Sequence, residues 1–147
     1  MNFNKAFNTI IGKCLTLRLI ETYHGDDKII PFYYYDIYLN QIDKPIGKIS
    51  IRIGHNQHSY YNGNIGYEVD EPYRGHGYAA QAVKMVLDVA RFHQMSELII
   101  ACSEDNFPSR RVIEKLKATH LDTLVPPPSY VFYYEGMKAK SIYRLDL

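Results

Sequence analysis

A glycine-containing loop at residues 74–79 has the clearest chemical signature in the sequence. It follows the apolar, β-branched stretch Ile65–Val69 and leads directly into a segment with helical periodicity that starts at Tyr78. Glycines allow positive φ angles and a close approach of the backbone to a ligand. The first N–H groups of a helix lack internal partners and lie at the positive end of the helix dipole. The segment therefore predicts an anion site suited to a pyrophosphate, the alternative being a plain glycine turn.

Residues 75–80 also fit G-x-G-x-x-A, the fingerprint of dinucleotide-binding loops. That fingerprint requires an acidic residue about 20 positions further on, at the end of the next strand. Position 95 is Met, Glu97 begins the next apolar stretch instead of ending it, and Glu104 lies too far along. A Walker-type phosphate loop is absent as well. A nicotinamide-dependent enzyme is therefore kept only as the least favoured functional hypothesis.

A second block, at residues 106–116, makes the assignment of the loop more specific. The loop matches the pattern of Gln or Arg, two residues, Gly, one residue, and Gly or Ala. The second block matches Asn, two residues, Ala or Ser, two residues, Val or Leu, one residue, then Glu-Lys-Leu. In this order and spacing the two blocks resemble the GNAT N-acetyltransferase superfamily, and most closely its ribosomal-protein-alanine acetyltransferase-like branch.

The resemblance implies a domain that binds acetyl-CoA as a co-substrate and passes its acetyl group directly to an amine. In that family the amides of the glycine loop hold the pyrophosphate, and the pantetheine lies between two diverging strands. The corresponding cofactor-binding residues here are Arg74, Gly75, His76, Gly77, Tyr78 and Ala79 for the pyrophosphate, and Asn106 for the pantetheine. The residue matching Val69 would offer its amide to the thioester carbonyl.

Three residues are candidates for proton transfer. Glu68 is the candidate base, and a solvent-facing strand carboxylate is the alternative. Many family members carry a Tyr acid seven residues after the Asn, but that position is Ile113 here. Ser109 is the substitute acid, or else a hydroxyl that satisfies a helix-start N–H; Tyr143 is a weaker third candidate. The missing Tyr keeps open a second hypothesis, a non-catalytic acetyl-CoA-binding domain.

The elements around these motifs predict one α/β domain spanning residues 1–147. Apolar alternation predicts strands at 14–21, 32–39, 46–53, 65–69 and 98–102, helices from 78 and 108, and further strands at 130–134 and 141–147. The expected architecture is a mixed sheet of six to seven strands with at least two packed helices, the acyl-CoA N-acyltransferase fold. Most GNAT domains place a helix pair between their first two strands, whereas residues 22–31 leave room only for a hairpin.

The missing helix pair predicts an open acceptor side. Residues 54–63, 1–13 and 126–128, or a second subunit in a homodimer, are the candidates to complete it. His55 and His58 have a metal-like spacing, but no further ligand is evident nearby, so we expect no metal. The predicted acceptor is a small-molecule amine or a peptide.

Composition and charge narrow the kinds of partner and the cell compartment expected for the protein. The 147 residues carry 17 Lys and Arg against 16 Asp and Glu, a net charge of +1, which argues against nucleic-acid binding through phosphates. The sequence shows no apolar window of the length that a membrane helix needs and no secretory leader, so no membrane partner is expected. Cys14 and Cys102, expected as buried free thiols, fit a cytoplasmic protein.

Overall fold

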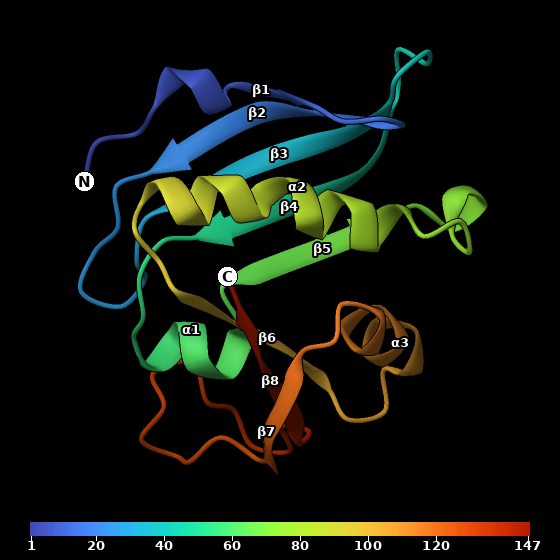
Figure 1. Ribbon diagram of the computed structural model, residues 1–147. Helices are drawn as coiled ribbons and strands as arrows, with labels where there is room; N and C mark the ends of the chain where they lie inside the picture. The colour runs from blue at the N-terminus through green and yellow to red at the C-terminus, as the bar shows by residue number, and fades with distance from the viewer.

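Two antiparallel sheets form the framework of the computed structural model, which describes residues 1–147 (Figure 1). The five-stranded sheet has the order β1 (Thr9–Ile11), β2 (Leu15–Tyr23), β3 (Phe32–Leu39), β4 (Pro45–Arg52) and β5 (Ile65–Val69). The three-stranded sheet has the order β6 (Glu97–Ser103), β8 (Lys140–Asp146) and β7 (Thr119–Leu124). The helices are α1 (Gln57–Asn62), α2 (Tyr78–Phe92) and α3 (Phe107–Lys115), with short 3-10 turns at Lys5–Phe7 and Glu71–Tyr73.

The larger core lies between α2 and the five-stranded sheet. Alternate residues of the central strands point toward the helix and are buried, including Tyr33, Tyr35, Ile49 and Ile51. The helix contributes a buried stripe at 3.6-residue spacing, formed by Ala82, Val83, Val86, Leu87, Val89 and Ala90. Burial of this stripe fixes the start of α2 beside the end of β5.

A smaller core lies between α3 and the three-stranded sheet. Ile113 of α3 is fully buried against Ile100 and Cys102 of β6 and Tyr143 of β8. Figure 1 shows β5 and β6 running in the same general direction and diverging toward α3. The parallel pair thus spans the boundary between two sheets, and the expected mixed sheet is divided into a five-stranded and a three-stranded sheet.

Most predicted elements are confirmed, including both long helices and the hairpin between β2 and β3 that replaces a helix pair. One predicted strand was wrong, and two strands were not predicted. The segment 130–134 forms turns, with the Tyr130 amide donating to Pro127 O and the Tyr133 amide to Tyr130 O. Two strands were missed. β1 has only three residues, and β7 is an edge strand with five exposed residues in a row, so its side chains show no alternation.

Two smaller differences concern the thiols and the loop before β5. Cys102 is buried, but Cys14 is exposed because it lies in the turn that precedes β2. Residues 54–63 contain the short helix α1, whose start is capped by Asn56. No helix in the chain is both long and apolar enough to cross a membrane.

Candidate functional site

The gap between β5 and β6 begins at Asn64, a buried residue that links three strands. The amide of Asn64 donates to Ile99 O at 2.6 Å, and its side-chain Oδ1 accepts from the Ile99 amide at 2.9 Å. The Asn64 Nδ2 group donates to Arg52 O at 3.1 Å and to Gly54 O at 2.7 Å. Asn64 is fully buried, so it joins β4, β5 and β6 at one point, beyond which the strands separate.

The far end of β5 presents backbone groups to this gap. The amide of Asp70 donates to Ile46 O of β4 at 2.7 Å. Because N–H groups alternate in direction along a strand, the Val69 N–H points away from β4 toward β6. The Val69 carbonyl accepts from Arg74 Nε at 2.7 Å, which folds the arginine side chain back over the strand end.

The glycine loop has the backbone that an anion site needs. Gly75 and Gly77 have φ angles of +85° and +77°, and Gly77 caps the start of α2 with no side-chain hydrogen bond. The first amides of α2 therefore lack a side-chain acceptor. A Cβ on Gly77 would lie 3.0 Å from Lys115 Nζ, so the ammonium group of α3 lies directly beside the loop.

At the start of α3, Asn106 and not Ser109 provides the side chain that caps the helix. Asn106 caps the helix by accepting from the Ser109 amide at 3.2 Å. The Ser109 hydroxyl is not used for capping and lies 2.8 Å from the Tyr67 hydroxyl. The Ser109 hydroxyl therefore does not satisfy a backbone N–H at the start of the helix.

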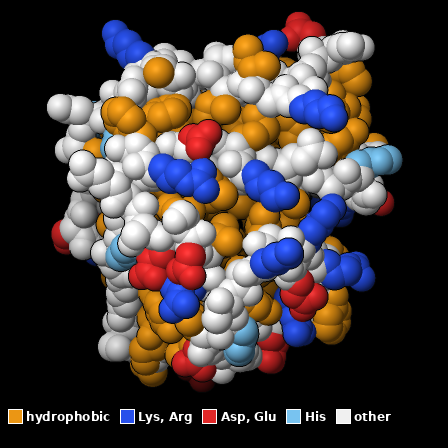
Figure 2. All heavy atoms as spheres, in the orientation of Figure 1, with side chains coloured by type: hydrophobic (Ala, Val, Ile, Leu, Met, Phe, Trp, Pro, Cys, Tyr) orange, Lys and Arg blue, Asp and Glu red, His pale blue; other side chains and the backbone are white.

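These parts surround a cavity of about 610 Å³, here called the cleft cavity. Of the predicted site residues, those that line it are Glu68, Val69, Arg74, Gly75, Gly77, Tyr78, Ala79, Asn106 and Ser109. His76 is not among them and is exposed. Arg74, Arg111 and Lys115 give the lining positive charge. Figure 2 shows Lys and Arg side chains gathered over the region between α2 and α3.

Tyr67 is one of the polar lining residues that were not among the predicted site residues, together with Tyr73, Arg111 and Lys115. Burial raises the pKa of Tyr67, while the hydrogen bond with Ser109 acts in the opposite direction. Burial also raises the pKa of the neighbouring Cys102 thiol, and Ser109 again opposes the shift. Both groups therefore stay protonated at neutral pH. Tyr67 alternates with the exposed Glu68 along β5, and nothing in the local sequence indicates a contact 42 residues away.

A smaller cavity of about 190 Å³, the back cavity, lies across β5 from the cleft cavity. Tyr67 and Glu68 line both cavities. Lys48 pairs with Glu68 in the β4–β5 register, and its Nζ lies 5.8 Å from the centre of the Tyr34 ring. Lys48 and Ser50 alternate with the buried Ile49 and Ile51, so the back cavity opens on the sheet face opposite α2.

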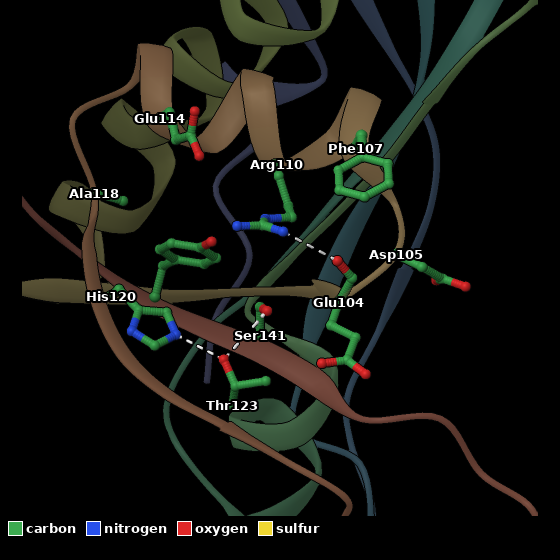
Figure 3. A pocket seen from close by; sticks show the side chains of 10 residues that line it. Glu104, Asp105, Phe107, Arg110, Glu114, Ala118, His120, Thr123 and Ser141 are labelled. Carbon is green, nitrogen blue, oxygen red and sulfur yellow. Dashed lines mark hydrogen bonds between the residues drawn. The ribbon is translucent and has the colours of Figure 1, made fainter.

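A third cavity of about 740 Å³, the far cavity, lies on the other side of α3 (Figure 3). Arg110 and Phe107 face it from α3, and Arg110 Nη1 donates to Glu104 O at 3.3 Å. Tyr143 lines this cavity and lies 5.2 Å from the His120 ring. The expectation that Tyr143 serves the cleft is therefore corrected: its position in β8, one strand beyond β6, places it under α3.

One of the segments expected on the acceptor side, residues 54–63, packs against the turns that follow another, residues 126–128. His58 of α1 lies 2.6 Å from the Tyr130 hydroxyl through Nδ1, and its ring centre is 4.5 Å from that of Phe132. Residues 1–13 lie elsewhere, because β1 forms the opposite edge of the five-stranded sheet from β5. The chain contains no group of three or more His, Cys, Asp or Glu residues placed to hold a metal ion.

Comparisons with known proteins agree with this geometry. Residues 12–119 match the family model described as the acetyltransferase (GNAT) domain. A Vibrio cholerae protein assigned as a ribosomal-protein-serine acetyltransferase superposes with a TM-score of 0.68 at 18% identity, covering 95% of this chain and 97% of that chain. RimL, the ribosomal L7/L12 alpha-N-protein acetyltransferase, solved with coenzyme A, gives 0.68 at 16% identity, covering 95% and 98%.

The microcin C7 self-immunity acetyltransferase MccE, solved with acetyl-CoA and AMP, gives a TM-score of 0.59 at 19% identity. That match covers 79% of this chain and 61% of MccE. No curated protein sequence matches significantly. The family match covers well over half of the residues and includes the loop, the gap and α3. The chain belongs to the GNAT family of acetyl-CoA-dependent acetyltransferases.

Proposed function

We propose that the chain, acting as one domain over residues 1–147, transfers the acetyl group of acetyl-CoA to the primary amine of a protein N-terminus or a small molecule. The observation that supports this most directly is the shared wall of the two cavities. Tyr67 and Glu68 line the cleft cavity on one side and the back cavity on the other. A thioester in the first and an amine in the second could therefore meet across β5 without a covalent enzyme intermediate.

The cleft cavity is the proposed acetyl-CoA site. The amides of residues 74–79 and the Lys115 ammonium would bind the pyrophosphate, and Asn106 would contact the pantetheine. The Val69 N–H would donate to the thioester oxygen, where negative charge develops during attack. His76, which points to solvent, would contribute its backbone alone.

The back cavity is the proposed amine site. Glu68 is exposed and reaches both cavities, so it can accept the proton that the attacking nitrogen loses, directly or through water. Lys48 stands opposite Glu68 and would repel a second cation in the cavity, which favours an acceptor with a single amine at its reacting end. Proteins with this fold include ribosomal-protein acetyltransferases, which makes a peptide N-terminus the first acceptor to test.

The test is thiol release from acetyl-CoA with peptides that begin in Ser or Ala and with a panel of small primary amines. Titration calorimetry with acetyl-CoA measures the first step separately. Glu68→Gln should lower kcat by about 100-fold with little change in acetyl-CoA affinity. The control is Glu71→Gln, an exposed carboxylate outside both cavities.

Binding without thiol release for any acceptor would favour the alternative, a non-catalytic acetyl-CoA-binding domain. The observation behind that alternative is Ile113, which is fully buried in the smaller core and supplies no acid at the position where many relatives have Tyr. Absence of acetyl-CoA binding would reject both versions.

A further inference from the structure

Tyr67 fills the space where the five-stranded and the three-stranded sheets diverge, here called the wedge. Its ring packs against both hydrophobic clusters, the one under α2 and the one under α3. It lies two residues before Val69 on the same side of β5, so its side chain crosses from β5 toward α3. The ring therefore closes the inner end of the cleft cavity, next to the proposed position of the thioester.

The Tyr67 hydroxyl meets α3 at a single residue. Its oxygen lies 2.8 Å from Ser109 Oγ and 3.4 Å from Ser109 O. The Ser109 amide is already bonded to Asn106, so the helix start is held while the Ser109 hydroxyl faces Tyr67. Ser109 lines the cleft cavity and can bond to Tyr67 and to a ligand at once, because a hydroxyl both donates and accepts.

We propose that Tyr67 is a positioning residue for the departure of CoA: it holds the Ser109 hydroxyl toward the thioester sulfur and supplies, through that hydroxyl, the proton that the leaving thiolate takes up. The inference rests on the proposed function. It assigns to a β5 tyrosine the role that Ile113 of α3 cannot fill.

The step balances in protons and electrons. The amine nitrogen forms a bond to the acetyl carbon and loses one proton to Glu68 or water. Collapse of the adduct breaks the C–S bond, and its electron pair goes to sulfur. Sulfur takes the Ser109 proton while Ser109 takes the Tyr67 proton. The phenolate then regains a proton from solvent after CoA leaves, so no oxidant or further reactant is needed.

Tyr67→Phe is the variant that tests this, because the ring still fills the wedge and only the hydroxyl is lost. With acetyl-CoA and a serine-starting peptide, kcat should fall about 10- to 100-fold while KM for acetyl-CoA stays within about twofold. With the acetyl selenoester of CoA the loss should be less than about threefold, because a selenolate is a weak base that leaves without a proton. A purely structural role would reduce both reactions equally.

A second measurement needs no acceptor. Thiolate absorbance of bound CoA, corrected with desulfo-CoA, reports the pKa of its thiol. Tyr67→Phe and Ser109→Ala should each raise that pKa by about one, since a donor to the thiolate is lost or misdirected. The control is Tyr35→Phe, which removes a buried tyrosine hydroxyl that donates to Phe7 O outside all three cavities.

The outcomes separate the two proposals. An unchanged thiol pKa in Tyr67→Phe, or equal losses with the thioester and the selenoester, would overturn the role of Tyr67 and leave acetyl transfer intact. Failure of the wild-type protein to bind either CoA or desulfo-CoA would instead remove the proposed function on which the inference rests. A Tyr35→Phe effect as large as that of Tyr67→Phe would reduce the result to a loss of packing.

Discussion

The cleft cavity and the far cavity lie on opposite sides of α3, and the larger of the two is not the one with the features of an anion site. The far cavity is about 740 Å³ against about 610 Å³, but three of its lining residues are the carboxylates Glu104, Asp105 and Glu114. The cleft cavity has a cationic lining, a helix N-terminus and the open edge of β5. A cavity binds an anionic thioester co-substrate through positive charge and free backbone N–H donors. Its volume alone therefore does not indicate whether it can bind one.

The largest expected effect comes from blocking the glycine loop. Gly77→Glu places a side chain and a negative charge where the pyrophosphate would bind, so acetyl-CoA affinity should fall by more than about 100-fold in calorimetry. Gly136→Glu is the matched control, because Gly136 also has a positive φ, of +83°, but lies in open space away from the cleft cavity. Retained binding in Gly77→Glu would mean that the cleft cavity is not the acetyl-CoA site.

The second effect concerns Asn64, which links β4, β5 and β6 where the cleft begins. Asn64→Ala removes three side-chain hydrogen bonds from a fully buried site, including the one from the Ile99 amide. The unpaired backbone groups should lower the free energy of unfolding by about 2–4 kcal/mol in urea titrations. Asn62→Ala, two residues earlier and only half-buried, is the control and should change it by less than about 0.5 kcal/mol. Equal effects would show that Asn64 is no special link between the sheets.

The third effect compares the two faces of α3 directly. Lys115 lines the cleft cavity, whereas its neighbour Glu114 lines the far cavity. Lys115→Gln should weaken acetyl-CoA binding by about 5- to 10-fold, and by less at high salt, because one charge-assisted contact to the pyrophosphate is lost. Glu114→Gln should leave the affinity unchanged within about twofold. If Glu114→Gln had the larger effect, the far cavity would become the candidate ligand site.

These same regions show what the sequence could predict. The glycine loop was found because a helix N-terminus that binds phosphate is built from consecutive residues, so its requirements appear as a local pattern. The Asn106 block was found through its resemblance to the second GNAT motif, which is also a run of consecutive residues. The helices that begin near 78 and 108 followed from periodicity, and the hairpin in place of a helix pair followed from the length of residues 22–31.

Contacts between distant segments left no such pattern. Tyr67 meets Ser109 across 42 residues, and Asn64 meets Ile99 across 35. The place of Tyr143, the third candidate acid, beside the far cavity could not be derived from its own segment, because that segment does not reveal the strand order. β7 was missed because an exposed edge strand has no buried face. The chemistry that depends on side-chain convergence was thus the part that required the structure.

The smallest effect concerns the contact between α1 and the turn at Tyr130, which neither cavity of α3 reaches. Burial lowers the pKa of His58, and the nearby Arg52 and Lys140 charges lower it further. The neutral ring is bonded to the Tyr130 hydroxyl. Below the ordinary histidine range the unfolded chain binds a proton that the folded protein resists, so this part of the stability is present at pH 7.5 and is lost as pH falls through the lowered pKa.

Thermal unfolding of wild type and His58→Gln at pH 7.5 and pH 5.0 measures this contribution. Wild type should lose more on acidification than the variant, by on the order of 2 °C in Tm, because the variant no longer carries the titrating ring. His55→Gln removes an exposed histidine three residues earlier and serves as the control. A variant that lost as much as wild type would show that His58 stays neutral or stays charged throughout, and that the α1 contact with Tyr130 is not an acid-sensitive part of the fold.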